Sequence, residues 1–279
     1  MPKRAVAVGD NCIDVYVYPA SCTFVGGNAV NVAVAMQRNG IQASYVGFVG
    51  NDAYGTLVVD SLQNEGVDVS RVRRVKGETA VTYVELRDGD RVFLEERLGV
   101  GADLTLDEDA LTFISEHDLV HNTHLGHTHE YVEEFKRLGL IVSFDYSTLC
   151  DRELLDSTLE HVDIAFASLA EEDASKAESV AQALAESGPG IVVVTLGAAG
   201  SLAYDGNRVW RQPSRQIEVV DTLGAGDAFA GIFLSDWLKG KSMDEILIDA
   251  TIGAAERCQH YGAWESRDTS MGQQGRRHA

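Results

Sequence analysis

The stretch Asp221-Thr222-Leu223-Gly224-Ala225-Gly226-Asp227-Ala228-Phe229 combines a turn of small residues with the start of an apolar helical pattern. Glycines let backbone N–H groups approach a ligand closely, and a helix start presents unpaired N–H donors and a positive dipole end. Asp227 lies at that start, where its carboxylate could accept a proton from a hydroxyl while the N–H groups hold a phosphoryl group. The stretch therefore predicts phosphoryl transfer to an alcohol, with Asp227 as the base.

The turn differs from two familiar nucleotide-binding motifs. Gly226 and Gly231 have Walker A spacing, but Ile232 and Phe233 follow where Lys and Ser or Thr belong. The dinucleotide fingerprint fails because Phe229 occupies its third glycine position. A small-residue turn before a helix is also a common packing device, so the stretch alone leaves a structural interpretation open.

Composition narrows the class of protein. The chain has 279 residues, 45% of them hydrophobic, and a formal net charge of −20. This acidity argues against nucleic acid or an anionic membrane as a partner, since both attract basic patches. An anionic nucleotide would have to be received locally, by backbone donors, a few basic residues and a metal ion.

Cysteine spacing and hydropathy point to the cytoplasm. The four cysteines are scattered without a C-x-x-C pair, which is typical of reduced thiols. Asp10 and Asp14 interrupt the apolar run that follows Lys3 and Arg4, so this run is not a secretion signal. No apolar stretch approaches the 18 residues that favour a membrane span. We expect a soluble cytoplasmic protein.

The N-terminal part predicts a sugar-binding edge. Residues 5–8 read as a buried strand, and Asp14 follows in an alternating stretch that places it opposite Ile13 and Val15. Asp14 is either a solvated strand residue or a ligand for substrate hydroxyls. Residues 26–31 then open a helix over 29–38, where Gly27 permits close approach and the amides of Asn28 and Asn31 either cap the helix or bind hydroxyls.

A small lid is expected outside the main sheet. Residues 44–49 and 67–75 read as strands, with a helix between them that ends at Asn64. Two alternating stretches, 80–86 and 91–97, flank an Asp-Gly turn, which is a hairpin signal. We interpret this hairpin, with residues 11–25, as a lid over the site. Arg97, Glu95 and Glu96 could contact a polar substrate, or all three could be solvated lid charges.

From residue 107 onward, strands alternate with helices. Strands are expected at 118–121, 140–145, 162–168 and 191–195, and helices at 130–138 and 171–187. Such alternation implies crossover units and a mainly parallel, doubly wound sheet. Residues 205–207 read as a hairpin turn. The helix that starts in the stretch 221–229 is expected to run to Lys239, and a last helix is expected over 242–260. Residues 265–279 are polar without periodicity and are expected to be a disordered tail.

Two further features allow more than one interpretation. Thr195 and Gly197 could contact nucleotide phosphate, or the turn that they begin could be a simple hairpin connection. The histidines at 121, 124, 127 and 129 lack the H-E-x-x-H zinc pattern and a nearby cysteine. We expect this histidine-rich loop to border the substrate pocket, with His127 as its substrate contact.

In its N-terminal and C-terminal motifs, the sequence resembles the PfkB or ribokinase-like carbohydrate kinases. Gly26-Gly27-x-x-x-Asn31 resembles the family's N-terminal signature, and Asp221-Thr222-x-Gly224-Ala225-Gly226-Asp227 resembles its C-terminal signature. The resemblance covers residues 1–264 and implies a ribokinase-like doubly wound fold: a mainly parallel sheet, helices on both faces, and a small β lid from about 11–25 and 78–98. Further stretches are similar to members that use ATP to phosphorylate O6 of the ketosamine fructoselysine: 9–14, 26–34, 166–168, 210–212 and 262–264.

The resemblance implies roles by position. Asp227 corresponds to the catalytic base. The anion hole corresponds to the backbone N–H groups of Gly224, Ala225, Gly226 and Asp227. The sugar contacts correspond to Asp14, Gly27, Asn28 and Asn31. The nucleotide contacts correspond to Thr195, Gly197 and the region of Cys258. Asp221 and Thr222 correspond to a loop that binds a monovalent cation such as K⁺ in some members.

One departure from the family's pattern concerns magnesium. Many members carry Asn-x-x-Glu where this chain has Ser168 and Glu171. The carboxylate remains, so the resemblance still implies Mg²⁺, held by Glu171 through water, while the role of Ser168 stays open.

Several alternatives remain at this stage. They are a related kinase for a fructose phosphate, ribose or a nucleoside, a non-catalytic ligand sensor on the same fold, and a dinucleotide oxidoreductase that the missing fingerprint disfavours. An exposed hairpin lid could also pair with a second copy, which would make a homodimer.

Overall fold

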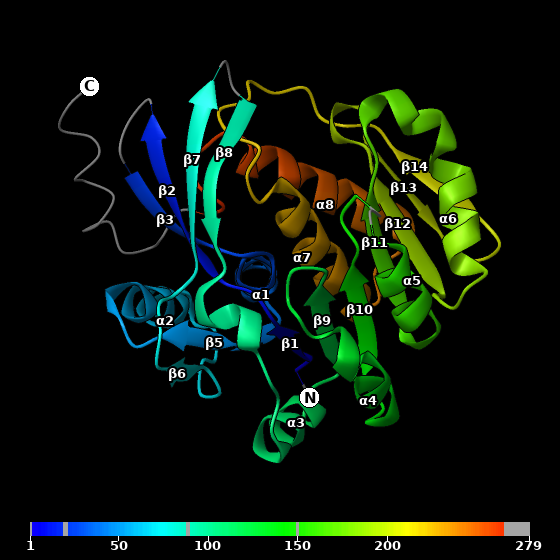
Figure 1. The fold of residues 1–279 in the computed structure, drawn as a ribbon. Helices are drawn as coiled ribbons and strands as arrows, with labels where there is room; N and C mark the ends of the chain where they lie inside the picture. Colours follow the sequence, from blue (N-terminus) through cyan, green and yellow to red (C-terminus); the bar gives the residue numbers. More distant parts are fainter. Residues whose placement is uncertain (1, 19–21, 88–89, 149–150, 265–279) are drawn as a thin grey trace.

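The computed structural model describes residues 2–18, 22–87, 90–148 and 151–264 of the chain. Figure 1 shows a long sheet between layers of helices, with a smaller group of strands to one side. The tail predicted at 265–279, Cys150 and the turn residues Asp88 and Gly89 lie outside the described residues. Within the described ranges, no helix is both long and apolar enough to cross a lipid bilayer.

Eight strands form the main sheet, in the order β14-β13-β12-β11-β10-β9-β1-β4. Their bounds are β1 (Arg4–Val8), β4 (Gln42–Val46), β9 (Leu119–Thr123), β10 (Ile141–Asp145), β11 (Ile164–Ser168), β12 (Ile191–Thr195), β13 (Ser201–Tyr204) and β14 (Val209–Gln212). From β4 to β12 the neighbours are parallel, whereas β13 and β14 run antiparallel. The predicted parallel sheet is confirmed, as is the hairpin around 205–207.

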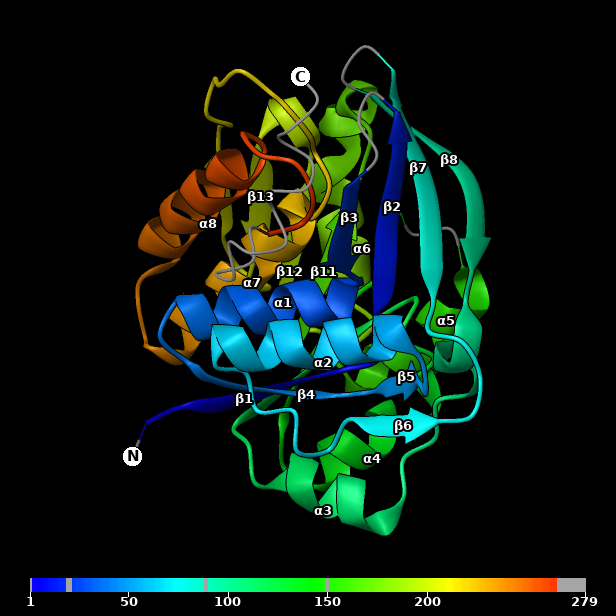
Figure 2. The same cartoon turned by 90° about the vertical axis from the view of Figure 1, so that its left-hand side faces the viewer.

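Helices cover both faces of this sheet. In β1, Ala5 and Ala7 belong to one core and Val6 and Val8 to the other, because successive side chains of a strand point to opposite faces. The first core includes residues of α1 (Asn28–Arg38), α2 (Ala53–Glu65), α7 (Ala225–Leu238) and α8 (Met243–Arg257), which face the viewer in Figure 2. The second includes residues of α3 (Glu108–Ser115), α4 (Val132–Arg137), α5 (Arg152–Thr158) and α6 (Ala177–Ala185).

The lid is a separate four-stranded sheet in the order β3-β2-β7-β8. Its strands are β2 (Cys12–Tyr18), β3 (Cys22–Gly26), β7 (Val81–Arg87) and β8 (Asp90–Arg97). β7 and β8 pair antiparallel, which confirms the predicted hairpin. In Figure 1 these strands stand apart from the main sheet, beside the start of α7.

The single strand predicted at 44–49 is divided at Gly47. β4 ends at Val46, and β5 (Phe48–Gly50) instead pairs with β6 (Arg73–Val75) in a two-stranded sheet. A Cβ at position 47 would lie 2.2 Å from the Tyr45 hydroxyl, so this position favours glycine. The strand predicted at 67–75 is correspondingly reduced to β6, with Asp68 forming only an isolated bridge to Ser44.

Short helical elements were the other weak point of the prediction. The sequence did not predict α3 and α5, which have only eight and seven residues. The helix expected over 171–187 is divided into a 3₁₀ segment, η4 (Glu171–Lys176), followed by α6. Three further 3₁₀ segments, η1 (Gly99–Asp103), η2 (His129–Tyr131) and η3 (Leu159–His161), lie in the connections, and η5 (Gly197–Ala199) follows β12.

Candidate active site

Polar residues gather where the parallel strands end. Asp10 follows β1, Thr123 ends β9, Asp145 ends β10, Ser168 ends β11 and Thr195 ends β12. The carboxyl ends of parallel strands meet at one edge, which is where open α/β sheets bind ligands. The lid and the start of α7 lie beside the same edge (Figure 1).

Asp227 is placed at this edge by the first turn of α7. Gly224 caps the helix with a left-handed backbone, φ 73°, and a Cβ there would lie 2.7 Å from the Cβ of Ala263. Glycine is therefore required at position 224. Asp227 is the third helical residue and is only 8% exposed. The carboxylate thus shares the helix start with N–H groups that have no partner within a helix.

The turn leaves room for a ligand beside Gly226. A Cβ built at Gly226 meets no described atom within 4 Å. The free space lies next to first-turn N–H groups and the positive end of the helix dipole, a combination that binds anions. The anion hole predicted at Gly224, Ala225 and Gly226 therefore borders open space, and Asp227 lies next to it.

A hydrogen-bond chain connects Asp227 to both ends of the sequence. The Asn31 amide nitrogen, Nδ2, donates to Asp227 Oδ2 at 2.7 Å. The Trp264 indole N–H donates to Asn31 Oδ1 at 3.1 Å. Because the indole only donates, it fixes which end of the amide faces the carboxylate. Trp264 therefore orients Asn31, and Asn31 orients Asp227, a relationship that the sequence did not predict.

Asp14 lies on β2 against the Gly26-Gly27 turn. A Cβ at Gly26 would lie 2.2 Å from Asp14 Oδ2, and one at Gly27, where φ is 105°, would lie 2.5 Å from the Asn11 Cα. The Cys12 thiol donates to Asp14 Oδ1 at 3.4 Å. Burial and the neighbouring Asp14 carboxylate raise the pKa of Cys12 well above its ordinary value, so the thiol stays protonated as a donor. Gly26 thus lets the turn close on Asp14, and Gly27 lets it close on the backbone of Asn11.

Asp10 is a site residue that the sequence analysis missed. Its carboxylate accepts hydrogen bonds from the backbone N–H of Asn28 at 2.6 Å, from that of Ala29 at 3.3 Å and from the Thr123 hydroxyl at 2.8 Å. The carboxylate therefore caps α1 and fixes Asn28 beside the strand ends. A signal was available, because an acid directly after a buried strand lies at the ligand-binding edge.

The nucleotide-side residues also come together. The hydroxyls of Ser168 and Thr195 lie 2.8 Å apart, and Glu171 Oε1 accepts the backbone N–H of Ala198 at 3.0 Å. Gly197 has φ 57°, and a Cβ there would lie 3.1 Å from Glu171 Oε1. Glu171 follows Ser168 by three residues, and carboxylate and hydroxyl oxygens are hard donors, which fit magnesium held mainly through water and phosphate.

Arg97, predicted as a lid contact, is not on the lid face that carries Asp14. In the lid, Val81 pairs with both Ile13 and Arg97, while Thr82 pairs with both Asp14 and Glu96. Residues opposite one another in paired strands share a face, so Arg97 lies on the face away from Asp14. There its guanidinium contacts Glu95 Oε1 at 2.7 Å and the Tyr83 ring. Glu96 is the charged residue that shares the face of Asp14.

The histidine-rich loop follows β9 and packs on the end of β1. Gly126 lies so close to Gly9 that a Cβ at Gly9 would be 2.7 Å from the Gly126 Cα. His127 is exposed, with a left-handed backbone at φ 52°. His121 is fully buried, and burial lowers its pKa to about 3, so its ring is neutral. Among the described residues, no three His, Cys, Asp or Glu side chains are arranged to hold a metal ion.

The loop before α7 is attached to the end of α8. The backbone N–H groups of Val220 and Asp221 donate to the Cys258 carbonyl at 2.8 and 3.2 Å. The Asp221 carboxylate accepts the Tyr16 hydroxyl at 2.6 Å, the Leu223 N–H at 2.9 Å and the Gly262 N–H at 3.0 Å. Residues from the lid, the α7 loop and the C-terminal segment thus converge on Asp221.

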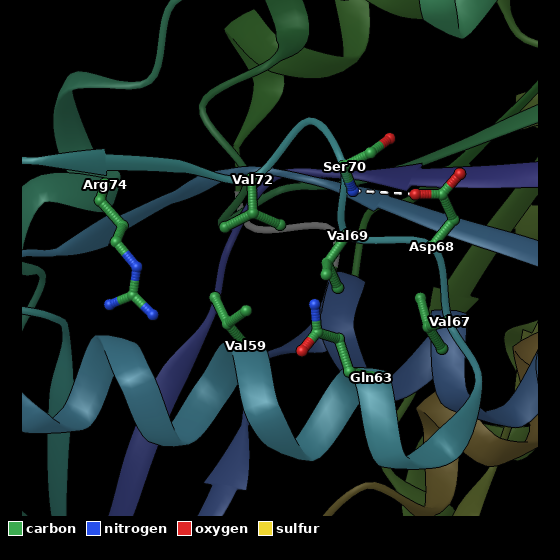
Figure 3. A pocket seen from close by; sticks show the side chains of 8 residues that line it. All are labelled: Val59, Gln63, Val67, Asp68, Val69, Ser70, Val72 and Arg74. Carbon is green, nitrogen blue, oxygen red and sulfur yellow. Dashed lines mark hydrogen bonds between the residues drawn. The ribbon is translucent and has the colours of Figure 1, made fainter.

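A surface hollow of about 380 Å³ lies elsewhere, between α2 and the segment before β6 (Figure 3). Its lining shares no residue with the groups above and consists of Val59, Gln63, Val67, Asp68, Val69, Ser70, Val72 and Arg74. The candidate site therefore rests on the polar groups at the strand ends and not on this hollow.

The chain is similar to known proteins over most of its length. A family model described as pfkB family carbohydrate kinase matches residues 6–270. Fructoselysine 6-kinase of Escherichia coli K12 is 40% identical over 262 residues, which cover 94% of this chain and 100% of that enzyme. Fructosamine kinase of Bacillus subtilis 168 is 34% identical over 266 residues, which cover 94% of this chain and 93% of that enzyme.

Solved structures show the same fold. Arabidopsis thaliana ribokinase complexed with ribose and ATP aligns with a TM-score of 0.83 at 23% identity, covering 94% of this chain and 95% of that one. A ribokinase II from Escherichia coli in complex with ATP and Mg²⁺ aligns with a TM-score of 0.82 at 20% identity, covering 95% of this chain and 96% of that one.

Proposed function

Because the chain belongs to the pfkB family of carbohydrate kinases, we propose that it transfers the γ-phosphoryl group of ATP to a primary hydroxyl, O6 of a ketosamine such as fructoselysine. The observation that carries this proposal is the position of Asp227. Its carboxylate is fixed by Asn31 at the start of a helix, beside the free space at Gly226. A proton acceptor next to an anion-binding turn is the arrangement that phosphoryl transfer to an alcohol requires.

The charge of the lid supports a ketosamine over a sugar phosphate. Tyr16, two residues after Asp14 on β2, bonds to Asp221, so this face of the lid looks toward the α7 loop. Asp14, Thr82 and Glu96 form one row across this face. A ketosamine carries a secondary amine that is protonated at neutral pH, and we assign Glu96 as its partner. A sugar phosphate would instead bring its negative charge close to two carboxylates.

ATP is assigned to the ends of β11 and β12. The hydroxyl of Thr195 and the backbone at Gly197 are offered to the phosphates, with the adenine toward the end of α8 near Cys258. Glu171, which contacts the backbone of Ala198 after β12, is the residue that would hold Mg²⁺ through water. A bound Mg²⁺ would neutralise charge on the phosphates.

The reaction uses this chain's groups as follows. Asp14 and Asn28 bind sugar hydroxyls and hold O6 near Asp227. As the O6–Pγ bond forms, the O6 proton passes to the Asp227 carboxylate, and the bond from Pγ to the β–γ bridging oxygen breaks to release ADP. The N–H groups of Gly224, Ala225 and Gly226 stabilise the charge on the transferring group. Positioning and electrostatics supply most of the acceleration in such a transfer.

A substrate panel tests this function. ADP release would be measured with fructoselysine, fructose, fructose 6-phosphate and ribose as acceptors, and phosphorus NMR would locate the new phosphate. We expect kcat/KM for fructoselysine to exceed the others by at least about two orders of magnitude, the scale for a site whose buried polar groups would otherwise lack partners. Faster turnover of a plain sugar or a sugar phosphate would reject the ketosamine, and absence of turnover on every acceptor would favour a ligand sensor.

We also propose that two copies pair through their lids. Val17, Tyr18 and Leu94 are lid residues that are 45%, 56% and 50% exposed. A second lid would remove these side chains from water, a favourable change of roughly 25 cal/mol for each Å² of apolar surface. Light scattering on the purified protein should give the mass of a dimer, and a monomer at micromolar concentration would refute the pairing.

A further inference from the structure

Arg257, the last residue of α8, carries a buried positive charge. Its side chain is only 6% exposed. Removing a guanidinium from water is costly unless hydrogen-bond acceptors and a counter-charge replace the water. The groups that surround Arg257 therefore show what this cation is for.

The guanidinium joins the loop before α7 to the segment after α8. Nε donates to the Leu223 carbonyl at 2.9 Å, and Nη2 donates to the His260 carbonyl at 2.9 Å. Nη2 also lies 3.8 Å from Asp221 Oδ2, on a carboxylate that is 0% exposed. A fixed cation thus contacts two backbone carbonyls and one carboxylate, and two of these three groups, on Asp221 and Leu223, lie within three residues of Gly224.

This arrangement does not fit a monovalent metal ion at Asp221 and Thr222. Such an ion needs several oxygen atoms to replace its hydration shell, as backbone carbonyls do for K⁺. Here the Leu223 carbonyl is occupied by Arg257, and the Asp221 carboxylate already accepts from Tyr16, Leu223 and Gly262. The carboxylate also has its positive partner in the guanidinium. The K⁺ suggested by the resemblance is therefore in conflict with the contacts of this loop.

We infer that Arg257 is a built-in cation that orders the anion-hole loop, so that the enzyme needs no monovalent metal ion. Leu223 directly precedes Gly224, whose left-handed backbone directs the N–H groups of Ala225 and Gly226. Holding the Leu223 carbonyl fixes the peptide that leads into this turn. Arg257 is accordingly a positioning residue for the phosphoryl transfer proposed above, and this inference rests on that function.

The first test needs only the unmodified protein. Turnover with ATP and the best acceptor would be measured in the chlorides of K⁺, Na⁺, Cs⁺ and tetramethylammonium at one ionic strength. We expect kcat and both KM values to agree within about twofold, and the midpoint of thermal unfolding to be the same in each salt. Activation of about tenfold or more by K⁺ over tetramethylammonium would overturn the inference.

The second test replaces the cation. In Arg257→Ala, we expect kcat to fall at least about tenfold with little change in the KM for the acceptor, the pattern of an interaction needed in the transition state. Millimolar guanidinium should restore part of that loss and raise the thermal midpoint of this variant alone. Arg257→Lys keeps a charge but not the planar fork, so its kcat should lie between that of Arg257→Ala and that of the unmodified protein. Arg152→Ala is the matched control, since that side chain is 87% exposed on α5.

The outcomes separate this inference from the function on which it rests. If no acceptor yields ADP, the proposed function fails, but the thermal midpoints in different salts and with guanidinium still test the role of Arg257. If the kinase is active and Arg257→Ala turns over like the unmodified protein, the positioning role is wrong. If Arg257→Ala does not fold, Arg257→Lys and the salt series on the unmodified protein decide the question.

Discussion

Asn31 Nδ2 lies 2.7 Å from Asp227 Oδ2, although 196 positions separate the two residues in the sequence. The bond brings the first turn of α1 to the first turn of α7. It fixes the carboxylate that we assign as the base. Catalysis by Asp227, as we propose it, depends on this bond.

We expect Asn31→Ala to lower kcat by roughly one to two orders of magnitude, since misplacing a catalytic group by about an ångström has effects of this size. Steady-state kinetics with ATP and the best acceptor would measure it. Asn39→Ala is the matched control, because Asn39 also donates its amide to a buried carboxylate, that of Asp236 at 3.0 Å, outside the site. The control should lose about 1 kcal/mol of stability and no activity. Equal effects of both changes on kcat would contradict the role of Asn31.

Trp264→Phe keeps an aromatic ring but removes the N–H that holds Asn31 Oδ1. The amide is then free to turn, so we expect kcat to fall by several-fold while the fold is retained, a loss on the scale of about one hydrogen bond. Trp210→Phe on β14 serves as the control and should keep full activity. A Trp264→Phe enzyme with unchanged kcat would show that the indole N–H does not orient the site.

Two glycines of the α7 turn should respond to alanine in opposite ways. Gly224→Ala places a Cβ in a left-handed residue and 2.7 Å from Ala263, so we expect a loss of stability of about 1–3 kcal/mol. Gly226→Ala meets no described atom within 4 Å and lies in a helix, where alanine is favoured, so stability should hold or rise. Its methyl group would occupy the free space assigned to the phosphoryl group, and turnover should fall sharply. Denaturant unfolding and kinetics on both variants would distinguish them; normal turnover of Gly226→Ala would place the phosphoryl group elsewhere.

His121 should make the protein less stable in mild acid. Burial lowers the pKa of His121 to about 3 in the folded state, against an ordinary value near 6.5. The unfolded chain therefore binds a proton that the folded chain refuses as the pH falls from about 6.5 toward 3. Unfolding becomes more favourable over this window by about 1.4 kcal/mol per pH unit.

The measurement is urea unfolding at pH 7 and pH 5. Between pH 7 and pH 5, the free energy of unfolding should fall less in His121→Asn than in the unmodified protein. The control His129→Asn, at an exposed position, should lose as much as the unmodified protein. An identical pH dependence in His121→Asn and the unmodified protein would show that His121 does not remain neutral in the fold.

The sequence predicted those parts of the fold that depend on local pattern. Short apolar runs that alternate with helical segments predicted the parallel sheet. Alternating apolar and polar residues on both sides of an Asp-Gly turn predicted the lid hairpin. The division at Gly47 was missed because β4 and β5 belong to different sheets, which is known only once the strands are assembled. α3 and α5 were missed because helices of eight and seven residues give too little periodicity.

The site was predictable only in part. The motifs identified Asp227 and Asn31 as candidates. The hydrogen bond between them and the one from Trp264 to Asn31 could not be predicted, because each joins residues about two hundred positions apart. The sequence could not separate Arg97 from Glu96 as a substrate contact, because a shift of one residue along a strand changes the face and the pairing of the lid strands was not known. Arg257 reads in sequence as an ordinary positive charge at a helix C-terminus, and its partner Leu223 lies 34 positions away.

The role of Asp227 as the general base is tested by the turnover of Asp227→Asn with ATP and fructoselysine, measured together with the affinity of this variant for nucleotide. The amide has almost the shape of the carboxylate but cannot take the O6 proton. We predict unchanged thermal stability, nucleotide affinity within about threefold of that of the unmodified protein, and a kcat lower by about two orders of magnitude or more, the scale of general-base loss. A kcat within a few-fold of that of the unmodified enzyme would contradict the assignment of Asp227 as the base.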